Sequence, residues 1–281
     1  MTDRSPSKTA AGVALLRAAH QLIDGEPKVL TDPIAAKLIE PTALAWLSTQ
    51  PAELQMPASL ALRSHVVTRS RFAEDRLQEA VARGVRQYVL LGAGLDSFAY
   101  RQPAWAAGLR IFEVDHPASQ QEKQARLRNA GIVPPENLVW AGIDFERTSL
   151  REGLLQSGFD PHVPAFMSCL GVLVYLEEAA VHQVFTFVGS LPPSSEIVFT
   201  FTGTRQEVDQ PALPALASRV ESLGEPFRSH LFEEDLVPKL TGLGFSEVTV
   251  LTPEQSRERY FQGRSDRLPA PRRARIASAR V

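Results

Sequence analysis

The chain has 281 residues, 44% of them hydrophobic, and a formal net charge of −2 at pH 7, so a dedicated nucleic-acid-binding protein is not expected. Its single cysteine, Cys169, excludes an intrachain disulfide and fits a reducing compartment, which predicts a cytoplasmic protein. Residues 1–12 are polar and no run of 18 residues is apolar, so the sequence predicts neither a secretory signal nor a contact with a membrane through a spanning helix.

The first 85 residues are predicted to form a helical cap. Apolar residues recur at steps of three and four between residues 8 and 23, as an amphipathic helix requires. An Asp-Pro pair at residues 32–33 is typical of a helix start, because aspartate caps free backbone N–H groups and proline fits the first turn. We expect this second helix to reach about residue 47. A third helix with one buried stripe is expected over residues 57–84.

After residue 85, short apolar runs alternate with helical segments. Strands are predicted over residues 88–91, 109–114, 138–141, 165–168, 196–201 and 245–251. Helices are predicted over residues 118–130, 150–156, 177–190 and 236–243. Such alternation favours parallel β-α-β units with right-handed crossovers. The sequence therefore predicts an α/β fold with one doubly wound, mostly parallel sheet over residues 86–281, joined to the cap in one structural unit.

A glycine turn follows the first predicted strand. Gly92 and Gly94 would let the backbone approach a ligand closely at the edge of the sheet where such folds bind ligands. Asp115 ends the second strand, 21 residues after Gly94, at the spacing of an acid that binds a ribose. Glu113 shares its side of that strand, but Asp115 is nearer the end. Two glycines alone could be an ordinary tight turn; together with the acid they favour an adenosine-containing cofactor.

The cofactor class follows from what the turn lacks. The dinucleotide fingerprint needs a third glycine, and Ser97 stands at that position; a P-loop motif is also absent. S-adenosylmethionine has ribose and adenine but no phosphate, and it would need only the turn and the acid. Asp144 and Phe145 follow the third strand and suit an adenine, although Asp144 could equally cap the helix that begins near Leu150.

These residues resemble the leucine carboxyl methyltransferase family, and more closely its bacterial branch of S-adenosyl-L-methionine-dependent O-methyltransferases, related to carboxyl methyltransferases of polyketide synthesis. The resemblance covers nearly the whole chain. It rests on residues 91–101 with 112–117, and on Lys8-Thr9-Ala10, Asp32-Pro33, Arg69 with Arg71, Asp144-Phe145, residues 171–176 and residues 259–264. It implies the seven-stranded, Rossmann-like sheet of class I methyltransferases and S-adenosyl-L-methionine as the cofactor.

The resemblance also implies which residues bind the cofactor. Gly92 and Gly94 would line its methionine part, and Asp115 would bind its ribose. Asp144 and Phe145 would hold its adenine.

The remaining implied roles concern the cofactor's carboxylate and the acceptor. Arg71 and Lys8 would pair with the carboxylate, since a guanidinium matches a carboxylate fork; Arg71 would alternatively pair with Asp75 on the helix surface, and Lys8 would be solvated. Tyr175 would face the acceptor as a catalytic residue together with Arg71, or else be a half-buried core tyrosine. Leu170 stands where the family often has a cofactor-contacting glutamate, which puts affinity in question.

The function predicted from these residues is O-methylation of a small metabolite in secondary metabolism, at a carboxylate, which needs no general base, or at a hydroxyl, which does. His230 is the candidate base, although a lone histidine there is more often a capping or surface residue. The alternatives are an NAD-dependent oxidoreductase and a non-catalytic protein that binds S-adenosylmethionine. Cys169 is expected to be buried and inert, and no spacing of residues predicts a metal site.

The C-terminal end is strongly basic. The last 18 residues contain six arginines and a single acid, Asp266. A solvated, frayed end explains this pattern without a function. Alternatively, the arginines form a flap that attracts an anionic acceptor.

Overall fold

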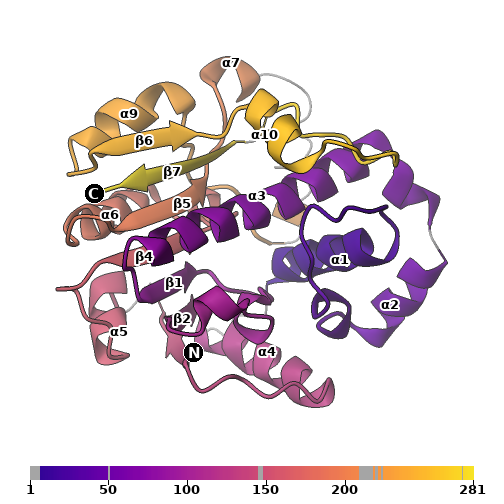
Figure 1. Ribbon diagram of the computed structural model, residues 1–281, viewed down its shortest axis with the longest axis horizontal. Coiled ribbons are helices and arrows are strands. Elements are labelled where there is room, and N and C mark those ends of the chain that lie inside the picture. The colour runs from indigo at the N-terminus through magenta and orange to yellow at the C-terminus, as the bar shows by residue number, and fades with distance from the viewer. Residues whose placement is uncertain are drawn as a thin grey trace.

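The computed structural model describes residues 7–49, 51–144, 148–208, 218, 221–222, 224–273 and 275–281. The N-terminal part is helical, as predicted. Its elements are α1 (Lys8–Leu22), η1 (Ala35–Lys37), α2 (Pro41–Ser48), η2 (Ala52–Gln55) and α3 (Pro57–Ala82). Figure 1 shows α1 and α2 to one side of the sheet, whereas the long helix α3 runs across it. No described helix is long and apolar enough to cross a membrane.

The helix predicted over residues 32–47 is wrong, because the structure divides it. A short 3₁₀ turn, η1, is followed by α2, which begins at Pro41. Proline lacks an N–H group and is best tolerated in the first turn of a helix, so Pro41 suits the start of a new helix. The expected cap does form: Oδ1 of Asp32 accepts hydrogen bonds from the N–H groups of Ile34 at 3.2 Å and Ala35 at 3.0 Å.

Seven strands form one sheet, which confirms the predicted doubly wound architecture. They are β1 (Gln87–Leu91), β2 (Arg110–Asp115), β3 (Leu138–Gly142), β4 (Ala165–Cys169), β5 (Glu196–Thr200), β6 (Glu247–Val250) and β7 (Ile276–Arg280). The order is β3-β2-β1-β4-β5-β7-β6, and only β7 runs antiparallel to its neighbours. The chain reverses its direction of winding between β1 and β4, which is where open α/β sheets bind ligands.

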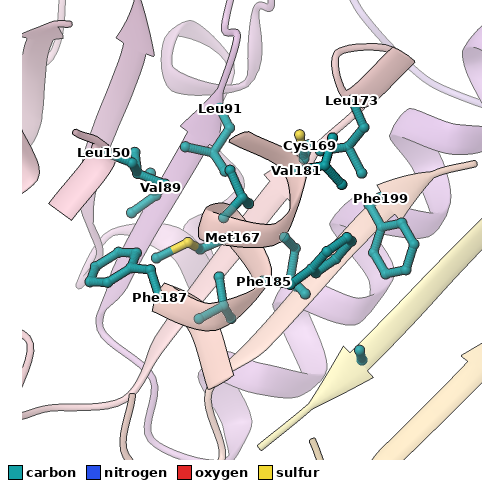
Figure 2. Packing of buried hydrophobic residues seen from close by; sticks show 14 of the residues in the cluster. Val89, Leu91, Leu150, Met167, Cys169, Leu173, Val181, Phe185, Phe187 and Phe199 are labelled. Atoms are coloured by element: carbon teal, nitrogen blue, oxygen red, sulfur yellow. The ribbon is translucent and has the colours of Figure 1, made fainter. Parts of the chain in front are cut away.

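Helices connect the strands and cover both faces of the sheet. After β1 the described helices are η3 (Phe98–Tyr100), η4 (Ala104–Ala106), α4 (Pro117–Asn129), α5 (Leu150–Gln156), η5 (Leu173–Tyr175), α6 (Glu178–Gly189), α7 (Arg205–Val208), α9 (Glu233–Thr241) and α10 (Pro253–Tyr260). Neighbouring strand residues point to opposite faces, so Val89 packs with α5 and α6 while Tyr88 packs with α3. Figure 2 shows Phe185 of α6 beside Phe199 of β5, with ring centroids 5.0 Å apart.

Helix α3 belongs to one of these layers. Its buried Phe72 and Leu77 lie in the same apolar cluster as Tyr88 of β1 and Phe166 of β4. The division of the chain at about residue 85 stays a prediction, and it falls between α3 and the sheet that α3 covers.

The basic C-terminal end is not frayed. Strand β7 lies inside the sheet between β5 and β6. The segment before it is fastened to the N-terminal helices: Oδ2 of Asp266 accepts from the N–H group of Gly25 at 2.7 Å, and the hydroxyl of Ser64 donates to the carbonyl of Pro269 at 2.6 Å. Arg264 pairs with Asp266. Much of this basic segment is therefore held in the fold by hydrogen bonds and strand pairing.

A buried carboxylate fastens α3 to the sheet, and removing its charge should destabilise the fold. Glu196 of β5 is fully buried and accepts hydrogen bonds from Arg76 and Arg83, each at 2.6 Å. Because hydrogen bonds to charged groups each stabilise by about 1.5–3 kcal/mol, Glu196→Gln should lower the free energy of unfolding by about 2 kcal/mol in urea titrations. Glu79→Gln is the control, since Glu79 pairs with Arg76 at 2.7 Å but is 51% exposed. Equal effects of the two substitutions would contradict this.

Candidate cofactor-binding site

The glycine turn after β1 has a backbone that only glycine adopts easily. Gly92 has φ +64° and Gly94 has φ +45°, both in the left-handed region. The turn is also tightly packed, because a Cβ added to Gly92 would lie 2.4 Å from Cγ2 of Val172. Conformation and space therefore both require glycine at residue 92.

Asp115 holds this turn with both oxygens of its carboxylate. Oδ2 accepts from the N–H group of Gly94 at 2.6 Å, and Oδ1 accepts from the N–H group of His116 at 2.7 Å. Glu113, two residues earlier, is fully buried and bound by Lys123 at 2.7 Å. The structure thus separates the two acids of β2, and only Asp115 lies at the ligand-binding edge.

Asp144 follows β3, the strand beside β2. The pairing of Asp115 with Gly142 brings the ends of the two strands together, and the N–H group of Ile143 donates to the carbonyl of Asp115 at 3.0 Å. Asp144 is partly exposed, whereas Phe145 lies outside the described residues. The turn, Asp115 and Asp144 therefore follow three adjacent strands at one edge of the sheet.

The two arginines of α3 differ in their surroundings. Arg71 has a side chain that is 44% exposed and bonds Oδ1 of Asp75 at 2.8 Å, the surface pair weighed as its alternative. Arg69 lies against Gly171, since a Cβ added there would be 2.6 Å from Nη1 of Arg69. Burial, together with nearby Arg17, lowers the pKa of Arg69 to about 10. No carboxylate among the described residues forms an ion pair with Arg69.

Helical periodicity could have identified Arg69. The sequence pattern places Val66 and Ala73 on the buried stripe of this helix, and Arg69 is three residues after the first and four before the second. Arg71 is turned about 200° away from Arg69 around the helix axis. Arg69 is half-buried, and a partly desolvated guanidinium without an ion pair is costly, so its position points to an anionic ligand.

Leu170 and Tyr175 follow β4, on the other side of the point between β1 and β4 where the chain reverses its direction of winding. Leu170 is partly buried and packs against the apolar cluster under α3. Tyr175 ends η5, where its ring lies 5.6 Å from that of Phe227. Burial raises the pKa of Tyr175, whereas the nearby side chain of Thr9 lowers it. Tyr175 is therefore half-buried and still touches polar groups.

The first turn of α1 covers the glycine turn. A Cβ added to Gly94 would lie 3.2 Å from the Cβ of Ala10, so the two backbones are close. Further along α1, Arg17 donates to the carbonyl of Leu95 and pairs with Asp96 at 3.3 Å. The side chain of Lys8 is exposed at the start of the helix. Helix α1 is thus fastened directly to the loop that would hold the cofactor.

Two other candidate reactive side chains differ in their surroundings. Cys169 is buried, and burial raises the pKa of its thiol to about 12, which makes it a poor nucleophile. His230 is exposed, stacks on Phe232 with ring centroids 6.0 Å apart, and lines a cavity of about 300 Å³ with residues of α6 and α9. No group of three His, Cys, Asp or Glu side chains within the described ranges could hold a metal ion.

Comparisons with known proteins agree with this geometry. Residues 10–189 match the model of the family "Leucine carboxyl methyltransferase". YktD of Bacillus subtilis, named as an S-adenosyl-L-methionine-dependent methyltransferase, is 32% identical over 226 residues, which are 77% of this chain and 72% of YktD. A protein of Streptomyces coelicolor with the same kind of name is 34% identical over 218 residues, 76% of this chain and 75% of that one.

Solved structures share the fold. A crystal structure from Thermobifida fusca, titled as a methyltransferase, superposes with a TM-score of 0.57 at 16% identity and covers 98% of this chain and 95% of that one. A DUF574 family protein from Streptomyces avermitilis has the same TM-score and identity, with coverage of 98% and 97%.

The fold and the site define a class I methyltransferase. The chain belongs to the leucine carboxyl methyltransferase family, which confirms the resemblance seen in its motifs. It is an S-adenosyl-L-methionine-dependent methyltransferase, and the expectation of that cofactor is confirmed. The residues present fit this cofactor, because Gly94, which has no side chain, bonds Asp115 at the turn and the cationic Arg69 has no ion pair among the described residues.

Proposed function

We propose that this protein transfers a methyl group to the carboxylate of a small, anionic molecule. The bound S-adenosyl-L-methionine supplies an activated methyl group, and the chain supplies position and electrostatics. A carboxylate is already nucleophilic, so no side chain has to remove a proton. The observation that carries the proposal is the set of side chains that shift the pKa of Tyr175: among the described residues these are Thr9, Arg69 and Glu225, with no histidine.

Among the described residues, the acid that acts on the Tyr175 phenol is already engaged. Both oxygens of Glu225 accept hydrogen bonds from the start of α1, and His230 lines a cavity with residues of α6 and α9. A hydroxyl acceptor would therefore have no free partner for its proton among the described residues that act on Tyr175. These contacts support a carboxylate acceptor over a hydroxyl. Membership of the family removes the support for an NAD-dependent oxidoreductase.

Each cofactor contact is assigned to a residue on the site's edge. In this proposal Gly92 and Gly94 line the methionine part, Asp115 binds the ribose hydroxyls, and Asp144 with Phe145 holds the adenine.

The acceptor side and the carboxylate contact complete the assignment. Tyr175 orients the acceptor, Leu170 contacts the cofactor through its backbone, and Lys8 stays a candidate at the start of α1. The roles of Arg71 stay predictions from the family, but its pair with Asp75 leads us to favour Arg69 for the cofactor's carboxylate.

The acceptor class can be tested by the chemistry of the product. The protein is incubated with isotope-labelled S-adenosyl-L-methionine and separate panels of carboxylic acids and phenols. A methyl ester releases labelled methanol in mild base, whereas a methyl ether does not. Base-labile product from the acids supports the proposal. Base-stable product from the phenols alone would contradict the carboxylate, and binding without any turnover would favour a non-catalytic protein.

The two arginines of α3 give a matched pair of substitutions. Arg69→Met should weaken S-adenosyl-L-methionine binding about tenfold in calorimetry, because one charge-assisted contact is lost and the side chain's length is kept. Arg71→Met should change the Kd less than about twofold, since an exposed i,i+4 pair contributes little. The opposite ranking would return the contact to Arg71.

A further inference from the structure

Glu225 binds the first turn of α1, although it lies 216 residues from Thr9 in the chain. Its Oε1 accepts from the N–H groups of Lys8 at 2.8 Å and Thr9 at 3.5 Å. Its Oε2 accepts from the hydroxyls of Ser7, at 3.0 Å, and of Thr9. Ser7 already caps the helix by accepting from the N–H group of Ala10 at 3.1 Å. The carboxylate of Glu225 therefore adds a second, long-range attachment at this helix end.

Thr9 continues this contact to the acceptor side of the site. Its side chain lowers the pKa of the Tyr175 phenol and the Glu225 carboxylate raises it, so both groups lie close enough to act on that phenol. The ring of Tyr175 lies 5.6 Å from that of Phe227, two residues after Glu225. A carboxylate, a threonine hydroxyl and a phenol thus form one connected group.

Residues 225–229, here called the clasp, also bind η5 directly. The N–H group of Arg228 donates to the carbonyl of Val174 at 2.7 Å, and the hydroxyl of Ser229 donates to the carbonyl of Leu173 at 2.9 Å. The clasp is therefore anchored on η5, and Glu225 is its attachment to α1.

The opposite side of the same helical turn faces the cofactor loop. Ala10 lies against Gly94, and Arg17 holds the carbonyl of Leu95. The first turn of α1 is thus placed between the glycine turn and the clasp. Any shift of this turn would move the Thr9 side chain, which acts on the Tyr175 phenol.

We propose that Glu225 is a positioning residue for methyl transfer: it fixes the first turn of α1 over the glycine turn and, through Thr9, orients the hydroxyl of Tyr175 toward the acceptor. This inference rests on the proposed methyl transfer. In-line displacement depends steeply on the alignment of the two reacting atoms, so a small loss of order here costs rate. Asp115 and Arg69 do not take part in the contact, so cofactor binding depends on it less.

The test is Glu225→Gln, in which the amide NH₂ can no longer accept hydrogen bonds and the negative charge at the helix end is lost. We expect kcat for a carboxylic-acid acceptor to fall about tenfold, while the Kd for S-adenosyl-L-methionine changes less than about threefold. Hydrogen exchange should accelerate at the amides of Lys8, Thr9 and Tyr175. Glu221→Gln, the same change at an exposed position four residues away, should leave both readouts unaltered.

The Thr9 variants test the relay itself. Thr9→Val should lower kcat as Glu225→Gln does, Thr9→Ser should lower it less, and the double variant Thr9→Val with Glu225→Gln should be no slower than the slower single variant. Unchanged kcat and exchange in Glu225→Gln would overturn the inference, as would faster exchange confined to Lys8 and Thr9. A wild-type protein that makes no ester would instead contradict the proposed function, and the exchange experiment would still decide whether Glu225 orders Tyr175.

Discussion

Asp115→Asn is expected to weaken S-adenosyl-L-methionine binding at least about 100-fold, or about 2.7 kcal/mol. Two effects add. The amide NH₂ either replaces the oxygen that binds the ribose hydroxyls or faces the N–H group of Gly94, to which Oδ2 is now bonded at 2.6 Å. In the second case two donors oppose each other and the glycine turn loses its fixed position. Calorimetric titration with S-adenosyl-L-methionine measures the loss.

Asp160→Asn is the control for this substitution. Asp160 is an exposed aspartate just before β4, where its Oδ1 accepts from the N–H group of His162 at 2.9 Å. It makes a similar contact with a loop N–H group, but at the opposite edge of the sheet. A Kd within about twofold of the wild-type value is expected there. Binding by Asp115→Asn that is as tight as in the control would remove Asp115 from the site.

The sequence predicted the part of the site that depends on local spacing. A glycine turn directly after a strand and an acid at the end of the next strand must meet, because parallel neighbours end at the same edge. The structure brings Gly94 and Asp115 into direct contact. Of Arg69 and Arg71, the motif alone could not choose the less exposed one, although the periodicity of α3 could have. Glu225 was missed because its contact with Thr9 spans 216 residues.

The fold was predictable where helices and strands alternate, and not where a strand inserts from far along the chain. Six of the strands have apolar runs that could be recognised, and their bounds differ from the predicted ones by one or two residues. Strand β7 reads Ile-Ala-Ser-Ala-Arg, and small residues carry little strand preference. Its burial comes from pairing with β5 and β6 on both sides. Because arginines surround β7 in the sequence, its charge pattern is typical of a solvated chain end and does not indicate a strand.

A chain that stops at residue 273 is expected not to fold, because it lacks β7. Residues Ile276, Ala277 and Ala279 are fully buried, and β7 pairs with both β5 and β6. Its removal would expose apolar residues of β5 and β6, leave β6 without a neighbouring strand and leave β5 paired with β4 alone. Losing two ladders and this burial exceeds the total stability of a typical domain, about 5–15 kcal/mol. Circular dichroism of the truncated chain should show neither native helix content nor a cooperative thermal transition.

Cys169 provides a direct measure of this loss. As the only cysteine it lies buried in β4, and burial raises the pKa of its thiol to about 12, so an aromatic disulfide reagent should modify it only when the sheet opens. Rapid modification is expected in the truncated chain and slow modification in the full chain. The control keeps β7 and removes charge: Arg272→Gln with Arg273→Gln should react as slowly as the wild type.

If the basic end were instead a flap for an anionic acceptor, the truncated chain would fold, protect Cys169 and bind S-adenosyl-L-methionine. The double arginine variant would then raise the acceptor's KM by the same factor as truncation. The two interpretations therefore differ in which variant is damaged. A structural β7 makes truncation far more harmful than the double arginine substitution, whereas a charged flap makes the two changes equally harmful to acceptor binding.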